Sequence, residues 1–140
     1  MRRWCAMLAV IILLAGCEEP VRGTLLDARS VTRAPIPWPK AVAAAPSAPP
    51  RILALWTNET AIAPGSQWVG RIATTTNVAS LEIRTESFSF NATRTSFGQF
   101  QFDQHVLDIV PQYKRGYTLQ FIARNTEGDE DVDLLPITLH

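Results

Sequence analysis

The stretch Tyr117-Thr-Leu-Gln-Phe-Ile-Ala-Arg124 decides the fold, because apolar and polar residues alternate along it. Successive side chains of an extended strand point to opposite faces, so the stretch separates into two sets. One face holds Tyr117, Leu119, Phe121 and Ala123. The other holds Thr118, Gln120, Ile122 and Arg124. We therefore predict a strand whose first face lies in a core and whose second face, including Ile122, meets water.

Short runs of the same kind surround this strand from Arg51 onward. They are rich in β-branched and aromatic residues, and turn residues such as Pro64-Gly65 and Glu127-Gly128-Asp129 separate them. The predicted strands are residues 52–56, 67–74, 79–84, 88–91, 100–102 with a continuation near 106–109, 117–124 and 132–139. Seven short strands at near-regular spacing predict an all-β, seven-stranded sandwich over residues 51–140.

The alternation also predicts which side chains point inward in three other strands. We expect Ala79, Leu81 and Ile83 to be buried, together with Leu135, Ile137 and Leu139, and Phe100 with Phe102. Proline cannot donate a ladder hydrogen bond, so Pro136 predicts an unpaired side or a bulge in the last strand. The period slips between Asp103 and Val106, which predicts a second bulge there.

The pattern Tyr117-x-Leu119-x-Phe121-x-Ala123-x-Asn125-x-x-Gly128 resembles the penultimate strand and following turn of fibronectin type III domains and related immunoglobulin-like modules. The resemblance is good over about a dozen residues and general over residues 51–140. It implies that the tyrosine and the apolar residues pack the core, and that the asparagine and glycine shape the last hairpin. The cysteine pair of true immunoglobulin domains is absent, and such sandwiches carry many functions.

The N-terminus has the order of a secretory signal: Met1-Arg2-Arg3, an apolar run from Trp4 to Ala15, and then Gly16-Cys17. The run is shorter than the roughly 20 apolar residues that cross a bilayer. Leu14-Ala15-Gly16-Cys17 resembles the lipobox of bacterial lipoproteins, which implies that residues 1–16 are a cleaved signal peptide and that Cys17 carries lipid. The alternative is an ordinary signal peptide with an incidental cysteine.

Residues 17–50 are predicted to be a lipidated cysteine followed by a proline- and alanine-rich tether. Seven of the 10 prolines of the chain fall between Glu18 and Pro50. Such a spacer of partly polyproline II character could reach roughly 100 Å if extended. The only other cysteine is Cys5, which would leave with the signal, so the domain is predicted to fold without a disulfide.

Catalytic motifs are not evident in the sequence. There is no Gly-x-Ser-x-Gly elbow, no phosphate-binding loop and no metal-ligand spacing, and we interpret His105 as a strand or turn residue. Residues 51–140 carry 7 basic and 10 acidic side chains, a net charge of −3, which disfavours nucleic acid as a partner. The prediction is a protein that is not an enzyme and needs no cofactor.

The acidic run at the last predicted turn has two interpretations. Glu127, Asp129, Asp131 and Asp133 could gather a calcium ion, although their spacing does not match the helix-loop-helix calcium motif. The alternative, which we favour, is a solvated turn whose charges protect a sheet edge. Asn125, Asp129, Glu130 and Asp131 are accordingly candidate partner-binding residues.

Trp38 lies between two prolines in the predicted tether, where it has no core of its own to join. It could anchor a partner, fold back onto the domain or stand exposed. The aromatic pairs Phe88/Phe90 and Phe100/Phe102 could form a sugar-binding platform, but alternate aromatics in a sandwich are more often core.

These features predict a lipid-anchored envelope lipoprotein whose sandwich is a non-enzymatic protein-binding or scaffolding module, such as an accessory subunit of a surface or secretion assembly. Its partners would be the membrane, through Cys17, and an envelope protein. The outer membrane or cell surface is favoured over the inner membrane. The alternative is a ligand-binding or inhibitory lipoprotein that captures a carbohydrate, a metal ion or a foreign enzyme.

Overall fold

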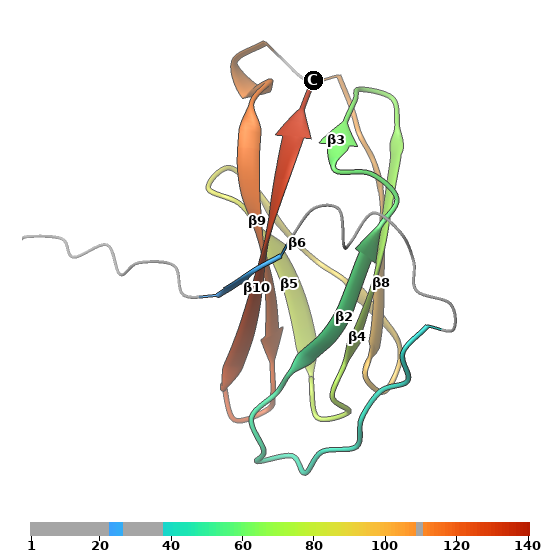
Figure 1. Ribbon diagram of the computed structural model, residues 1–140, viewed down its shortest axis with the longest axis vertical. Helices are drawn as coiled ribbons and strands as arrows, with labels where there is room; N and C mark the ends of the chain where they lie inside the picture. The colour runs from blue at the N-terminus through green and yellow to red at the C-terminus, as the bar shows by residue number, and fades with distance from the viewer. Residues whose placement is uncertain (1–22, 27–37, 109–110) are drawn as a thin grey trace, which may run out of the picture.

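The computed structural model describes residues 23–26, 38–108 and 111–140 of the chain (Figure 1). They form strands and one short 3-10 helix, η1. The elements are β1 (Thr24–Leu25), β2 (Ile52–Thr57), β3 (Ala61–Ile62), β4 (Gln67–Thr74), β5 (Ser80–Arg84), β6 (Ser89–Asn91), β7 (Thr93–Ser96), β8 (Gln99–His105), η1 (Pro111–Tyr113), β9 (Gly116–Arg124) and β10 (Glu130–Leu139). Within the described residues, no helix has the length and apolar character that a membrane crossing would require.

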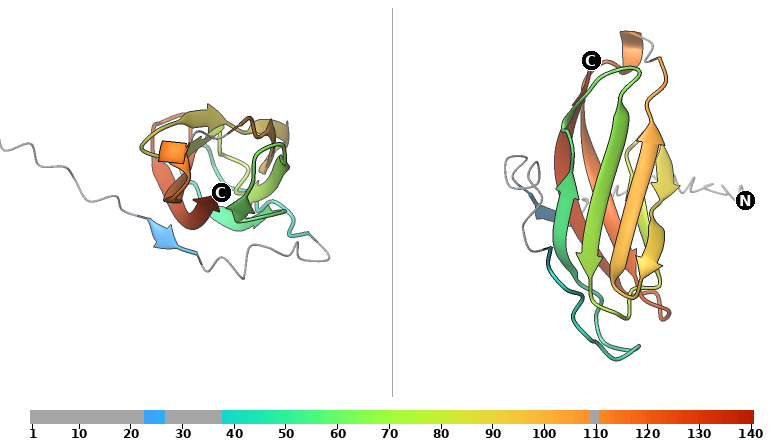
Figure 2. Two further views of the ribbon diagram at one scale, coloured as in Figure 1. Left: turned by 90° about the horizontal axis from the view of Figure 1, so that it is seen from above. Right: turned by 90° about the vertical axis from the view of Figure 1, so that its right-hand side faces the viewer.

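The strands form two sheets that pack face to face (Figure 2). One sheet has the order β1-β10-β9-β5-β6, with β3 also paired to β10, and the other has the order β2-β4-β8-β7. The all-β sandwich predicted from the sequence is confirmed. In Figure 1 the turn between β9 and β10 lies at the lower end of the sandwich and the C-terminus at the upper end.

The core lies between the sheets and is built from the alternating faces that the sequence predicted. Its fully buried members include Leu81, Ile83, Leu119, Phe121 and Leu135. Burying one such large side chain stabilises the fold by roughly 1.5–3 kcal/mol. Phe100 and Phe102 are also buried, so they belong to the core and not to a sugar-binding platform. Ala79, which was predicted to be buried with Leu81 and Ile83, does not belong to the core, because it precedes β5 and is exposed.

Ile122 corrects the prediction that the second face of β9 meets water. Its side chain is only 3% exposed, although it lies outside the core between the sheets. Glu82 and Val132 are its neighbours on the two flanking strands. Arg124, two residues further along β9, bonds Glu82 across this face. The sequence pattern around Ile122 alone did not reveal that these neighbouring side chains would exclude water from it.

Three short strands were missed, because each depends on partners far away in the sequence. β1 and β3 have two residues each and exist through parallel pairing with β10. β7 carries Thr-Arg-Thr-Ser with no apolar residue and pairs with β8. The bulge expected between Asp103 and Val106 is also wrong, since β8 pairs with β4 without a register shift from Gln99 to His105.

Pro136 interrupts the outer edge of β10, as its missing amide predicts. On the inner side it pairs with Thr118 of β9. On the outer side β1 pairs at Asp133 and Leu134, and β3 pairs at Thr138 and Leu139. The two covering strands therefore meet β10 on either side of the proline.

Residues 38–50, which the sequence assigned to the tether, lie against the sandwich. Val42 forms a parallel bridge with Thr75, and its carbonyl accepts a 2.9 Å hydrogen bond from the Thr76 amide. The Asn77 side chain donates to the Ala48 carbonyl at 2.6 Å. These hydrogen bonds give several backbone groups of the segment a partner and attach it to the sandwich.

Candidate binding surfaces

Asn125 organises the turn at the lower end of the sandwich. Its Oδ1 accepts hydrogen bonds from the amides of Glu127 and Asp129 at 3.0 and 2.9 Å, and its Nδ2 donates to Asp129 Oδ2 at 3.0 Å. Nδ2 also lies 3.3 Å from the Ala48 carbonyl, which joins the turn to the segment 38–50. These hydrogen bonds shape the hairpin, and because Asn125 is buried, little of its side chain is exposed to a partner.

The carboxylates of the same turn are engaged within the chain. Glu130 accepts a 2.6 Å hydrogen bond from Arg124, whose guanidinium also bonds Glu82 at 2.8 Å. The interaction with Arg124 lowers the pKa of Glu82, and the same contact raises the pKa of Arg124. Asp131 Oδ2 accepts a 2.6 Å hydrogen bond from the Ile52 amide of the opposite sheet. Replacing Asp129, Glu130 and Asp131 together would therefore disturb the fold as well as the surface charge.

Asp131 and Asp133 lie on the inward face of β10, where they pair with Ala123 and Phe121. Burial raises the pKa of the Asp133 carboxyl to about 6, and the neighbouring charge of Asp131 adds to the rise. In the part of the chain that the structure describes, no group of three histidine, cysteine, aspartate or glutamate side chains is arranged to hold a metal ion. The candidate calcium ligands Glu127, Asp129, Asp131 and Asp133 therefore do not converge.

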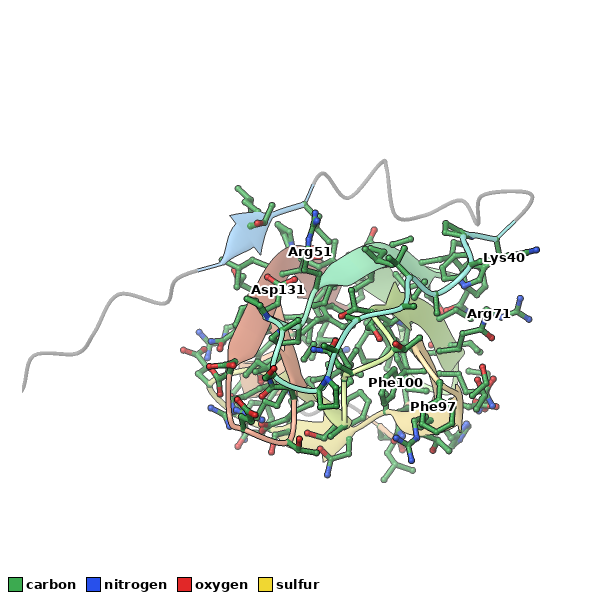
Figure 3. The ribbon with its side chains drawn as sticks, turned by 90° about the horizontal axis from the view of Figure 1, so that it is seen from below. Lys40, Arg51, Arg71, Phe97, Phe100 and Asp131 are labelled. Atoms are coloured by element: carbon green, nitrogen blue, oxygen red, sulfur yellow. The ribbon has the colours of Figure 1, made fainter. Side chains whose placement is uncertain are left out.

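Trp38 folds back onto the domain, one of the three outcomes that the sequence left open. Its ring is partly buried beside β4, β7 and β8, where it borders a hollow of about 220 Å³ together with Arg71 and Thr95. Figure 3 shows Lys40, Arg71 and Phe97 at this side of the sandwich, seen from below. The guanidinium of Arg71 also lies 5.9 Å from the Trp56 ring centre. Trp38 thus covers part of the outer face of the four-stranded sheet.

A column of aromatic rings runs from the core toward the upper end. Phe102 packs edge-on against Trp68 at 4.7 Å between ring centres, and Trp68 meets Phe90 at 6.0 Å. Phe88 stacks on Phe90 at 6.4 Å and reaches the surface. The buried indole of Trp68 donates a 2.8 Å hydrogen bond to Thr57 Oγ1, which fixes the ring orientation.

The column ends in an apolar hollow of about 490 Å³ at the upper end of the sandwich. Its floor includes Trp68, Phe90 and Ile137, and its rim carries Leu107, Phe88 and Tyr113. Leu107 is 75% exposed, and Phe88 and Tyr113 are exposed as well. His105 lies at the end of β8 and contributes to the polar part of the rim with Asp108. A concave apolar surface with large exposed side chains around it can bind a complementary apolar group.

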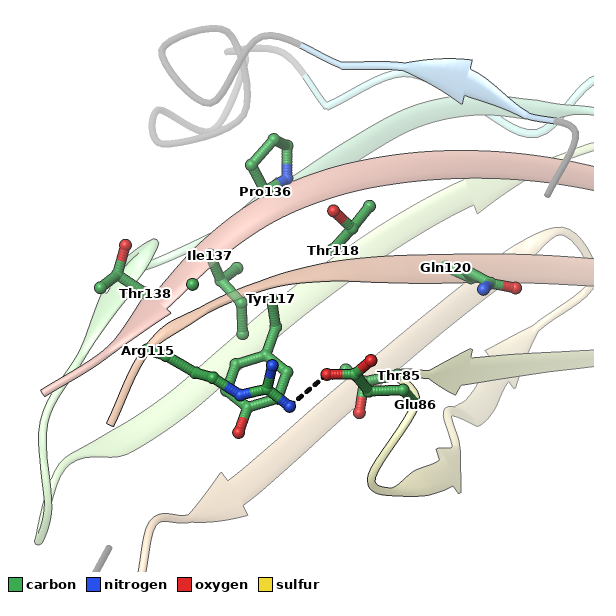
Figure 4. Close-up of a pocket in the computed structure, with 10 residues that line it drawn as sticks. Thr85, Glu86, Arg115, Tyr117, Thr118, Gln120, Pro136, Ile137 and Thr138 are labelled. Atoms are coloured by element: carbon green, nitrogen blue, oxygen red, sulfur yellow. Dashed lines mark hydrogen bonds and ion pairs between the residues drawn. The ribbon is translucent and has the colours of Figure 1, made fainter. Parts of the chain in front are cut away.

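A second, polar hollow of about 710 Å³ lies on the outer face of β9 and β10 (Figure 4). Arg115 forms an ion pair with Glu86 there and lies 4.7 Å from the centre of the Tyr117 ring. Tyr117, and then Glu86, raise the pKa of Arg115. Thr118, Gln120 and Pro136 are among the other residues of this open surface. The ion pair is exposed to water, so it adds little to stability.

β7 is an edge strand of the four-stranded sheet, and all four of its residues are exposed. Its pairing with β8 shifts between Arg94 and Ser96, which shortens the regular part of the edge. An exposed strand edge can pair with a strand of another chain, but irregular and short edges do so less readily.

Comparison of the chain with models of known protein families finds no match, and comparison with curated proteins finds no significant similarity. Cys17 and the signal peptide lie outside the described residues. The sequence missed the upper hollow, because it predicted a strand continuation near residues 106–109. That prediction is wrong: β8 ends at His105, and Leu107 lies beyond the strand at the rim of the hollow. An apolar residue such as Leu107 beyond the end of a strand is the signal that could have indicated it.

Proposed function

We propose that this chain is an envelope lipoprotein, exported through residues 1–16 and anchored by lipid on Cys17, whose sandwich binds a protein partner and performs no catalysis. One observation carries the binding role: the apolar hollow at the upper end, with Leu107, Phe88 and Tyr113 exposed around it. Interaction sites often combine such an apolar centre with a polar rim.

The sandwich is proposed to be of the immunoglobulin-like type. Its strand order supports this, because β2-β4-β8-β7 corresponds to the ABED sheet and β10-β9-β5 to the GFC sheet, with β6, β1 and β3 as additional strands. The Tyr117 hydroxyl donates a 3.1 Å hydrogen bond to the Tyr113 carbonyl, four residues upstream. A tyrosine at the start of the penultimate strand makes this kind of bond in immunoglobulin-like folds.

A protein partner fits the hollow because the exposed rim extends the contact beyond the concave floor. Leu107 stands almost free in solvent, where its burial by a partner would be favourable. A partner that inserts one branched or aromatic side chain would meet Trp68 and Phe90 at the floor. Such anchored pockets supply most of the binding energy of many interfaces.

The competing proposal is capture of a small ligand, and the aromatic floor of the same hollow favours it. A volume of about 490 Å³ lies within the range of small-molecule sites. The two proposals differ in the importance of the rim. A small ligand would depend on the floor, whereas a protein would also need Leu107 and Tyr113.

The test is recovery of partners from the cells that make the protein, with the lipidated chain as bait and chemical crosslinking before extraction. Leu107→Asp should reduce recovery of a specific protein at least tenfold. Phe97→Asp is the matched control, because Phe97 is similarly exposed, at 71%, but lies at the turn between β7 and β8, near the other end. Equal recovery with both variants would exclude the hollow as the protein-binding surface.

The lipid anchor has its own test. Cells supplied with a labelled fatty acid should incorporate it into the wild-type chain and not into Cys17→Ser. Incorporation that is unchanged in the variant would contradict the anchor.

A further inference from the structure

We propose that the pairing of β1 with β10 holds the sandwich within about 20 Å of the bilayer, with the flank that carries β1 toward the lipid headgroups. This inference rests on the proposed lipid anchor at Cys17. The domain would then be joined to its anchor by a short connection and not by a long tether. The flank that carries β1 would lie next to the lipid surface that holds the anchor.

β1 is attached to β10 by specific contacts. Thr24 pairs with Asp133 and Leu25 with Leu134, and the Leu26 amide donates a 2.8 Å hydrogen bond to the Leu134 carbonyl. The Leu26 side chain packs against the core cluster. This strand therefore continues the sheet with both a backbone bond and an apolar contact.

The backbone at Gly23 also lies close to β10. A Cβ atom at this position would lie 2.9 Å from the Val132 carbonyl oxygen and 3.0 Å from Leu134 Cγ. Real Cβ atoms are rarely found so near a backbone oxygen, so a larger residue would have to push β1 away from β10. Glycine permits the contact because it has no side chain.

The length of chain between anchor and strand sets the distance. Cys17 and Gly23 are separated by 6 residue steps. An extended chain spans at most about 3.3–3.6 Å per residue, so this connection reaches about 20 Å. Without β1, the first contact of the chain with the sandwich would be near Trp38, and 21 residue steps could reach roughly 65 Å in extended polyproline geometry.

The attached flank presents an apolar side chain next to the anchor. Leu25 is 68% exposed, beside the point where the chain leaves toward Cys17. Figures 1 and 2 show β1 along the side of the sandwich and away from its two ends. A bilayer at this flank would leave the upper hollow open to partners that lie along the membrane surface.

The experiment uses the purified, lipidated mature chain inserted into a supported bilayer of phosphatidylethanolamine and phosphatidylglycerol. Mass spectrometry first establishes diacylglycerol on Cys17, and its absence would overturn the anchor in the proposed function. Neutron reflectometry then measures the water gap between the headgroups and the protein layer. The wild-type gap should not exceed about 20 Å.

Two variants separate β1 from β10 by different means. Leu26→Pro removes the amide that bonds Leu134, and Gly23→Val introduces the clash with Val132. Each should at least double the mean gap or spread the protein density beyond 20 Å, up to about 65 Å. Leu25→Ser is the control, because it keeps the backbone bonds and should leave the gap unchanged. A wild-type gap above 20 Å, or both variants matching the wild type on a lipidated chain, would overturn the role of β1 while leaving the anchor intact.

Discussion

The two ends of the sandwich differ in whether their surface groups already have partners within the chain. At the lower end, Asn125 joins the β9–β10 turn to the segment 38–50, and Asn77 and Thr76 bond the same segment at Ala48 and Ala44. At the upper end, the aromatic column opens into a hollow with Leu107 exposed beside it. The comparison teaches that a cluster of charged and polar residues can serve to hold the fold together through hydrogen bonds within the chain. The surface left for a partner is apolar, and it is harder to recognise in the sequence.

The largest expected effect concerns the core that both ends share. Phe121 is fully buried, and Phe121→Ala should lower the free energy of unfolding by roughly 3–5 kcal/mol. Ile122→Ala should also be costly, by about 2–4 kcal/mol, because its face of β9 is shielded from water. Urea denaturation of the two variants measures both values. A loss below about 1 kcal/mol for Ile122→Ala would restore the original prediction that this side chain faces water.

The next prediction concerns the hydrogen bonds by which Asn125 holds the lower end together. Asn125→Ala removes an acceptor for two amides and a donor to Asp129, and should destabilise the domain by roughly 2–3 kcal/mol. Glu127→Ala is the control, since only the backbone amide of Glu127 takes part in this network. Thermal unfolding should separate the variants clearly. Equal melting temperatures would show that the turn holds its shape without Asn125.

A smaller effect concerns Asp133, whose carboxyl lies on the inward face of β10. Its pKa rises from 3.8 to about 6 on folding, so the folded state binds more protons between these values. Stability should therefore fall as the pH rises from about 4 to 6, and the penalty should remain above pH 6. Asp133→Asn should remove this penalty and raise the free energy of unfolding at pH 7 by roughly 1 kcal/mol. This value is reduced to allow for the partial exposure of the side chain.

Unfolding in urea at pH 4.5 and pH 7 measures this difference. Glu82 acts in the opposite direction, because Arg124 lowers its pKa and its contribution is lost at low pH. Both proteins contain Glu82, so its contribution cancels when the free energies of unfolding of wild type and Asp133→Asn are compared at each pH. A stability difference that does not change with pH would contradict the raised pKa of Asp133.

The smallest effect on stability is expected at the upper end. Leu107→Ser should change the free energy of unfolding by less than about 0.5 kcal/mol, because the side chain is mostly in water. Calorimetry measures this change. A loss of 2 kcal/mol would show that Leu107 packs in the folded domain, and the contrast between a closed and an open end would then be wrong.

The sequence predicted the strands that have their own alternation. β9, β4 and β5 were found within one or two residues, and the inward set that includes Leu81 and Phe121 was correct except for Ala79. It did not predict β1, β3 or β7, because these depend on long-range pairing and not on local pattern. Burial of Ile122 likewise depends on side chains from two other strands.

The candidate site was predicted less well, for a related physical reason. Charge and turn residues identify an exposed hairpin but do not show whether its polar atoms already have partners. Asp131 bonds an amide 79 residues away, and Asn125 reaches a carbonyl 77 residues away. The upper hollow forms where the starts of β4 and β6 meet the ends of β8 and β10, so it is a property of the assembled sheets.

Pro136 has a consequence for molecules crowded on one membrane. Anchored proteins diffuse in two dimensions, where neighbours meet often and a long open strand edge would promote the growth of intermolecular sheets. β10 is the longest described strand, with 10 residues, yet β1 and β3 cover its outer edge on both sides of a residue that has no amide to donate. Replacing Pro136 with valine would supply that amide and raise the tendency of neighbouring molecules to aggregate.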